Sequence, residues 1–141
     1  MGTALRNLQL GPTVYDVSVA VTGGQLVEPD GTTGKVKPAT AGSIRVLGAA
    51  MGDAQPPIDP FNPPAVLDIS RSRPRVAVEY GPCDIDSVTY SAPANFGQPL
   101  VCTGSGQVGP AGAAPDPGSL VGRCTTPSGV LAGAVGSMRL F

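Results

Sequence analysis

Apolar and polar residues alternate over short runs along this chain, and this alternation predicts β-strands rather than helices. The clearest run is Val14 to Val21, in which Val17, Val19 and Val21 share one face. Further strands are predicted over residues 25–28, 35–37, 44–47, 66–70, 76–80, 88–90, 120–124 and 135–141. The pattern therefore favours an all-β fold.

One stretch, residues 24–50, is repeated at residues 97–125. Both copies begin with Gly-Gln, reach Leu-Val, pass a glycine-marked turn and continue with Gly-polar-Val-x-Pro-Ala. Glycine and proline at such positions are typical of tight turns between antiparallel strands. A solenoid would need three or more repeats, so two copies predict one domain, residues 13–141, with two pseudo-symmetric β units.

The composition supports a folded chain with many turns. Glycine and proline are abundant, at 20 and 16 residues, but 41% of the residues are hydrophobic and only 13% are charged, which argues against disorder. With no Trp and 4% aromatic residues, the core must be built mainly from aliphatic side chains and is thin. We therefore expect a small β-sandwich or barrel-like domain with long Pro/Gly-rich loops, and some apolar surface covered by a partner or by further copies.

Residues 1–12 precede the first strand and are predicted to form an extended N-terminal arm. The arm places Leu5, Leu8 and Leu10 among polar residues and Arg6. A segment this short does not hold a helix alone. Two interpretations remain open: a frayed terminus, or an extended arm that adds to the sheet edge of another protein or wraps a neighbour.

Three arginines, Arg71, Arg73 and Arg75, are spaced two residues apart and would share one face of an extended chain. They fit docking onto an acidic protein surface, or a solvated edge strand protected by charge. No aromatic residue lies between them, and the net charge is only -1, so binding to nucleic acid is not expected.

Two further segments are candidates for self-association. The proline-rich loop 53–64 contains Ile58 and Phe61, which either pin the loop to its own core or contact a neighbouring subunit. The last residues include Met138, Leu140 and Phe141, which are apolar and predict a terminal strand at a subunit contact.

The residues needed for most catalytic mechanisms are missing. The chain has no His, and its lysines are Lys35 and Lys37 on one predicted hairpin strand. Asp84 and Asp86 lack the glycine and distal glutamate of a calcium loop and are interpreted as turn residues. We therefore expect a protein that is not an enzyme and that needs no metal or cofactor.

Cysteine usage and targeting signals refine this expectation. Three cysteines, an odd number without a Cys-x-x-Cys pair, are expected to be small buried hydrophobes: Cys83, Cys102 and Cys124. The sequence contains no secretory signal, no apolar run long enough to span a membrane and no myristoylation signal. We expect synthesis in a cytoplasm and no membrane partner.

The repeated unit resembles the small capsid decoration proteins of tailed phages. In those proteins a glycine-marked hairpin is followed by valine-x-proline-alanine and then by leucine-glycine-x-alanine. The matching segments here are 24–27, 34–39, 44–50, 75–78 and 94–101. The resemblance covers most of residues 14–125.

This resemblance implies a mostly β protein that binds the outer surface of an icosahedral phage head and stabilises it. It implies the major capsid protein as partner, a homo-oligomer with a trimer favoured, and location in the virion. The arm residues and the three arginines are then the candidate capsid contacts. The alternative is a virion-displayed adhesion or glycan-binding module, although only Tyr15, Tyr80 and Tyr90 could supply the Tyr or Trp side chains that sugar binding favours.

Overall fold

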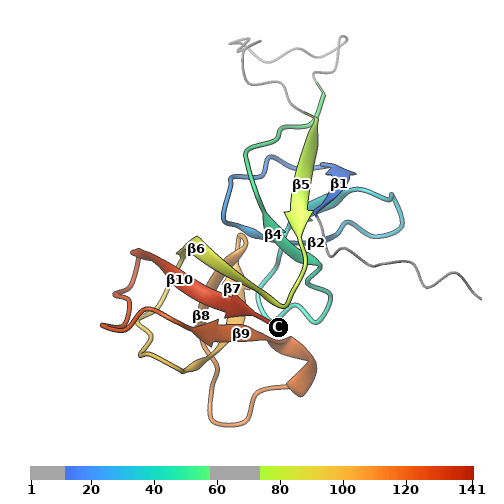
Figure 1. Ribbon diagram of the computed structural model, residues 1–141. Helices are drawn as coiled ribbons and strands as arrows, with labels where there is room; N and C mark the ends of the chain where they lie inside the picture. The colour runs from blue at the N-terminus through green and yellow to red at the C-terminus, as the bar shows by residue number, and fades with distance from the viewer. Residues whose placement is uncertain (1–11, 58–73) are drawn as a thin grey trace, which may run out of the picture.

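The computed structural model describes residues 12–57 and 74–141 and shows an all-β fold, as predicted (Figure 1). Two five-stranded antiparallel sheets form, one from each half of the chain. We call them the first unit and the second unit. The first unit has strand order β1-β5-β4-β2-β3, from β1 (Thr13–Asp16), β2 (Leu26–Pro29), β3 (Val36–Pro38), β4 (Gly48–Ala50) and β5 (Arg75–Glu79).

The second unit repeats the first strand for strand. Its order is β6-β10-β9-β7-β8, so each strand holds the place of the strand five earlier in the chain. A short 3-10 turn, η2 (Pro117–Ser119), precedes β9. The strands are β6 (Cys83–Thr89), β7 (Pro99–Gly104), β8 (Gln107–Pro110), β9 (Leu120–Cys124) and β10 (Val135–Leu140). The pseudo-symmetry predicted for 24–50 and 97–125 therefore extends over both complete units.

Each sheet also closes on itself in the same way. A parallel bridge joins Val17, just after β1, to Val36 in β3, and the equivalent bridge joins Tyr90 to Val108. The bridge makes the two outer strands of each sheet neighbours, so each unit is a small barrel-like sheet. Closure protects sheet edges, which otherwise invite pairing with other chains.

Glycines at equivalent positions show why the central strands need small residues. A Cβ on Gly48 in β4 would lie 2.1 Å from the carbonyl oxygen of Glu79, and a Cβ on Gly122 in β9 would lie 2.1 Å from that of Arg139. Because real Cβ atoms do not approach so closely, both strands require glycine where they face the last strand of their unit.

The turn before the first hairpin is duplicated at the level of single hydrogen bonds. The Gln25 side chain accepts from the Thr22 N–H at 2.8 Å, and Gln98 accepts from the Asn95 N–H at 3.0 Å. The glycine within each turn has a positive φ, +90° at Gly24 and 80° at Gly97. This explains why the Gly-Gln pair marks both copies in the sequence.

The two units differ in their cores. A smaller cluster in the first unit consists of Val17, Val21, Val27, Val36, Ala50, Ala54, Val76 and Val78. A larger cluster fills the second unit around Tyr90, Leu100 and Met138, and it also includes Leu26, Ala39 and Ala49 of the first unit. The larger core therefore joins the units.

Three predicted elements are placed differently by the structure. The expected strand 44–47 is irregular, and β4 instead uses Gly48–Ala50, where glycine at position 48 permits the close approach of Glu79 in β5. The expected strand 14–21 ends as β1 at Asp16. The acids Asp84 and Asp86, expected in a turn, are exposed positions of β6, where they alternate with the half-buried Cys83 and Ile85. Among residues 12–57 and 74–141, no helix has the length and apolarity to cross a membrane.

Candidate interaction surfaces

Most predicted capsid-contact and self-association residues lie outside the described residues. These are Leu5, Arg6, Leu8, Leu10, Ile58, Phe61, Arg71 and Arg73. The structure does locate where their segments join the fold. Residue 12 leads into β1, and residue 74 leads into β5, its partner strand, so both segments attach to the first unit.

Arg75 is the one predicted capsid-contact residue within the described part of the chain. It begins β5 and is exposed, opposite Asp16 in the register of β1 and β5. Its Nε donates to Asp16 Oδ1 at 3.0 Å. An exposed pair of this kind is worth little in stability, so the guanidinium can exchange this partner for another carboxylate.

The prediction that Met138 and Leu140 mediate self-association is corrected by their burial. Both are side chains of β10 that point inward, at 0% and 3% exposure, and they pack in the core of the second unit. The strand predicted for the end of the chain is present, but its apolar face covers its own sheet. Phe141 follows the strand and is 55% exposed.

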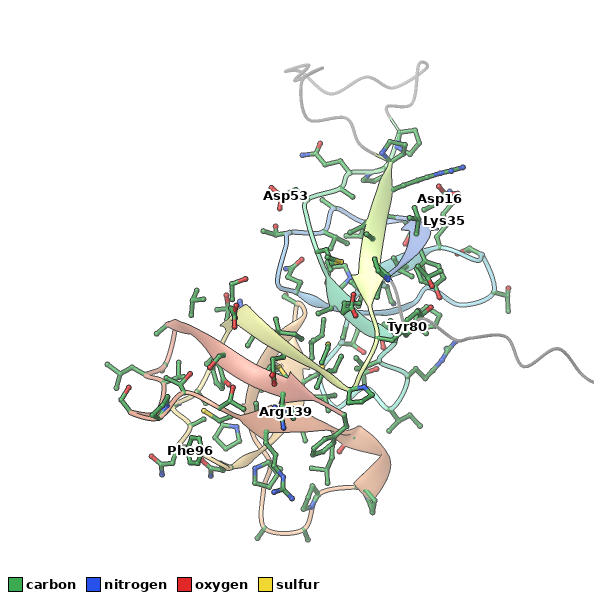
Figure 2. All side chains as sticks on the ribbon, viewed as in Figure 1. Asp16, Lys35, Asp53, Tyr80, Phe96 and Arg139 are labelled. Atoms are coloured by element: carbon green, nitrogen blue, oxygen red, sulfur yellow. The ribbon has the colours of Figure 1, made fainter. Side chains whose placement is uncertain are left out.

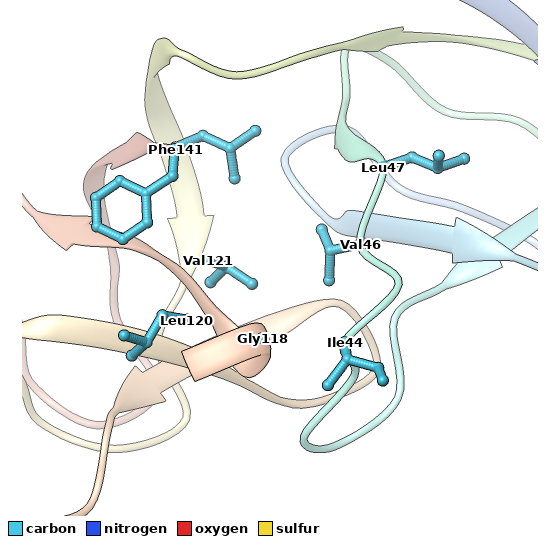
Figure 3. A pocket seen from close by; sticks show the side chains of 8 residues that line it. Ile44, Val46, Leu47, Gly118, Leu120, Val121 and Phe141 are labelled. Carbon is cyan, nitrogen blue, oxygen red and sulfur yellow. The ribbon is translucent and has the colours of Figure 1, made fainter. Parts of the chain in front are cut away.

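Phe141 is one of the residues that line a small cavity between the two units (Figure 3). The cavity has a volume of about 90 Å³, enough for a single aliphatic side chain. From the first unit, Ile44, Val46 and Leu47 line it, and Ile44 is 64% exposed. From the second unit, Gly118, Leu120, Val121 and Leu140 complete the wall. The residues expected to form a strand at 44–47 thus contribute to the surface where the units meet.

A wider groove of about 490 Å³ lies on another part of the junction and has acidic walls. It is lined by Asp53 and Glu79 of the first unit and by Asp84 and Asp86 of the second. Asp84 accepts from Arg139 at 2.8 Å, and this hydrogen bond holds the pKa of Asp84 below its ordinary value. Within the described ranges, no three His, Cys, Asp or Glu side chains are grouped so as to hold a metal ion.

The three thiols are free. Cys102 and Cys124 are buried, and Cys83 is half-buried. Burial raises the pKa of Cys102 to about 12, and burial together with the charges of Glu79 and Asp84 raises that of Cys83. A thiol becomes nucleophilic when its pKa is lowered, so Cys83 and Cys102 are poor nucleophiles. Cys124 packs as a small buried side chain in the larger core.

A docked hairpin also connects the units. The tip of the β7–β8 hairpin, at Ser105 and Gly106, lies against the base of the β2–β3 hairpin. The Leu26 N–H donates to Gly106 O at 3.0 Å, the Gly106 N–H donates to Ala39 O at 2.9 Å, and Gln25 Nε2 donates to Ser105 O at 3.0 Å. A Cβ on Gly106 would lie 2.7 Å from the Gln25 Cβ and from Leu26 O, so the close approach requires glycine.

Exposed apolar residues of the second unit were not anticipated from the sequence. Phe96 is 64% exposed and Leu131 is 77% exposed. Figure 2 shows Phe96 on the second unit, well away from the labelled residues of the first. The available signal was a lone aromatic residue beside Gly97 in a turn, where no strand could bury it.

Comparisons with known proteins give no match by sequence and a similarity among solved structures. No protein-family model matches the chain, and no curated protein matches it by sequence. Among solved structures, the chain is similar to one described as the head fiber gp8.5 N base in bacteriophage phi29, with a TM-score of 0.60 and 14% sequence identity. The similarity covers 92% of each chain. At this identity the similarity establishes a shared fold.

Proposed function

We propose that this chain is a structural protein of a phage head, which binds the outer surface of the icosahedral capsid and stabilises it. The observation that carries the proposal is the shared fold with a phage head fiber base over 92% of both chains. The resemblance of the repeated hairpin to capsid decoration proteins supports the same assignment independently. The partner is the major capsid protein, and the location is the virion.

The first unit is the capsid-facing unit in this proposal. The arm and the segment that contains Arg71 and Arg73 both join the fold there, at β1 and β5. Arg75 adds an exposed guanidinium on the same strand pair. A capsid surface offers the same site many times, so modest contacts at each site stabilise the assembled shell by mass action.

We also propose that the protein is not an enzyme and that it acts as a homo-oligomer, with a trimer favoured. The absence of His from the sequence and the raised pKa values of Cys83 and Cys102 support the first point. The exposed Phe141 beside the junction cavity is a candidate contact for the second.

The alternative, a glycan-binding module, has less support from the tyrosines. Tyr90 is fully buried, and its hydroxyl donates to Ser137 O at 2.7 Å. The hydroxyls of Tyr15 and Tyr80 bond to each other. A glycan array separates the two functions, because a decoration protein should bind no sugar above background.

Co-sedimentation with expanded, empty shells of the phage that encodes the protein tests the proposal. The full chain should sediment with the shells, and a variant lacking residues 1–10 should lose most of this binding while its thermal unfolding stays cooperative. Phe96→Ser, on the second unit, is the matched control and should bind like the unaltered chain. Virions without the protein should release DNA at a lower temperature. Equal retention of the full chain and the truncated variant would overturn the role of the arm, and equal DNA release would overturn stabilisation.

A further inference from the structure

The chain contains each strand of the sheet twice, so the docked hairpin and the surface that receives it each have an equivalent in the other unit. In the contact between the units, the second unit supplies the hairpin tip and the first unit supplies the surface that receives it. The first unit has its own hairpin tip, and the second unit has its own receiving surface. These two duplicates are not used in the contact between the units.

The free hairpin tip is the turn between β2 and β3. Gly34 corresponds to Gly106, since each lies two residues before the bridged valine of its unit, Val36 or Val108. Both glycines have a positive φ, 74° and 67°. Gly106 is buried by its contact, whereas Gly34 and the neighbouring Thr32 and Thr33 are exposed, and a Cβ on Gly34 would meet no atom within 4 Å.

The free receiving surface is formed by Gln98, Pro99 and Ala111. They correspond to Gln25, Leu26 and Ala39, and the backbone geometry is conserved between the two sets. The Ala39 N–H donates to Leu26 O at 2.9 Å, and the Ala111 N–H donates to Pro99 O at 2.9 Å. The Gln98 side chain is oriented by the Asn95 N–H as Gln25 is by Thr22.

Exposure shows that this second surface is uncovered. Leu26 has 0% exposure because the hairpin tip and the larger core cover it. Pro99 is exposed and Ala111 is half-exposed. In the first unit, the Gln25 amide and the Ala39 carbonyl bind the hairpin tip. The Gln98 amide and the Ala111 carbonyl present the equivalent groups on the second unit.

We propose that the tip Thr32–Gly34 of one copy docks on Gln98, Pro99 and Ala111 of a second copy. The occupant is a copy of this chain because the free tip is equivalent to the docked tip, and the free surface is equivalent to the surface on which that tip docks. The contact joins two different surfaces, so it is heterologous, and it produces a closed ring or an open row of copies. It deepens the homo-oligomer of the proposed function, and its test needs no capsid.

One substitution in the sequence weakens this contact relative to the internal one. Pro99 stands where Leu26 stands in the first unit, and proline has no N–H to donate to the incoming carbonyl oxygen. The contact between copies therefore has two of the three hydrogen bonds of the contact between units. Copies bound side by side on a shell would be held at high local concentration, where a weak contact is sufficient.

Restoring the missing donor is the sharpest test. Pro99→Leu should tighten self-association about tenfold, because one restored hydrogen bond contributes roughly that factor. Pro127→Leu is the matched control, since it makes the same change at an exposed turn residue of the same unit and should leave self-association unchanged. Sedimentation equilibrium measures both. Equal association of the two variants would overturn the proposal.

A two-component experiment distinguishes a heterologous contact from a symmetric one. Pro99→Leu combined with Thr32→Arg keeps the improved receiving surface and blocks the tip, while Ala111→Arg keeps the tip and blocks the surface. Each variant alone should be a monomer, and their mixture should form a one-to-one complex that grows no further. Self-association of either variant alone at the level of Pro99→Leu would contradict the proposed contact.

Cross-linking tests the chain with Pro99 in place, without reliance on a stabilising substitution. Thr32→Cys with Ala111→Cys should give disulfide-linked dimers, trimers and larger species under oxidation, because each copy links to the next. Thr32→Cys with Phe96→Cys is the control and should remain monomeric. The absence of cross-linked species from the first pair would overturn the contact, whereas co-sedimentation with shells would be unaffected, so this failure differs from failure of the proposed function.

Discussion

The two units share one hydrogen-bonding pattern but fill it with different side chains. The bridge that closes each sheet has Val17 in the first unit and Tyr90 in the second, and both are fully buried. The second unit packs its tyrosine with Leu100 and Met138, while the first relies largely on valine and alanine and contributes Leu26 to the neighbouring core. The comparison teaches that turns and central glycines define the fold. The volume of the side chains determines which unit contains the larger core, and here the second unit also buries residues of the first.

The largest expected effect comes from truncating the residues at the closing bridge. Tyr90→Ala should lower the free energy of unfolding by about 4 kcal/mol, because it leaves a cavity in the larger core and removes the bond to Ser137. Val17→Ala should cost about 2 kcal/mol, since it removes less buried surface. Urea unfolding monitored by circular dichroism measures both values. An equal cost would show that the units are equally important for stability.

The equivalent glycines test whether the two frameworks are truly alike. Gly48→Ala and Gly122→Ala should each lower the free energy of unfolding by about 3 kcal/mol, because each new methyl group meets a backbone carbonyl. Gly112→Ala is the control, since its Cβ has no atom within 4 Å and the expected change is below about 0.5 kcal/mol. A lower free energy of unfolding in only one of these two variants would show that the central strands are not equivalent.

An acid-sensitive contact distinguishes the first unit. Glu28 is buried and accepts hydrogen bonds from the Thr40 N–H, at 3.0 Å, and from the Ser43 hydroxyl. Burial raises the pKa of Glu28, but these hydrogen bonds and the charge of Lys37 outweigh it and leave the pKa below its ordinary value. Val101 occupies the equivalent place in the second unit, opposite Gly109 as Glu28 is opposite Lys37.

The sign of the pH dependence follows from the lowered pKa. The ionised carboxylate stabilises the fold above its unfolded pKa, and this contribution is lost as the pH falls through the lower, folded pKa. Glu28→Gln should cost about 1–2 kcal/mol at neutral pH and should reduce the loss of stability below pH ~4.5. Thermal unfolding from pH 7 to pH 3 tests this. An unchanged pH profile would mean that Glu28 does not carry the acid sensitivity.

The smallest effect is expected at the exposed ion pairs, which link the first strand of each unit to its last strand. These pairs are Asp16 with Arg75 and Asp84 with Arg139. Asp16→Asn and Asp84→Asn should each leave the unfolding temperature without a measurable change, because solvent screens both pairs. A clear loss in one variant, absent in 1 M NaCl, would reveal an electrostatic difference between the units.

The sequence predicts the fold class and the repeat because turn chemistry is local. Gly-Gln in each copy marks a turn that requires a positive φ, and the hairpins follow from it. The position of β4 could not be predicted in this way. Ile44, Val46 and Leu47 have higher strand propensity than Gly48–Ala50, but the close approach of the Glu79 carbonyl requires glycine at position 48, and that approach is a tertiary contact.

The candidate sites were less predictable than the fold. An apolar run such as that around Met138 indicates burial without saying whether the covering surface is internal or belongs to a partner, and here it is internal. The docking of the hairpin could not be predicted from the sequence for a similar reason. Leu26 and Pro99 hold equivalent positions in the repeat, and only the structure shows that one is covered and the other is exposed.

The connection between the fourth and fifth strands has a practical consequence for engineering. It runs from residue 51 to residue 74 in the first unit and only from 125 to 134 in the second, yet both join strands of the same geometry. The scaffold therefore accommodates an insertion at this place without a change in strand order. The turn at Pro127–Gly129 is consequently a suitable position for inserting a foreign peptide for display, with the longer connection as the natural precedent.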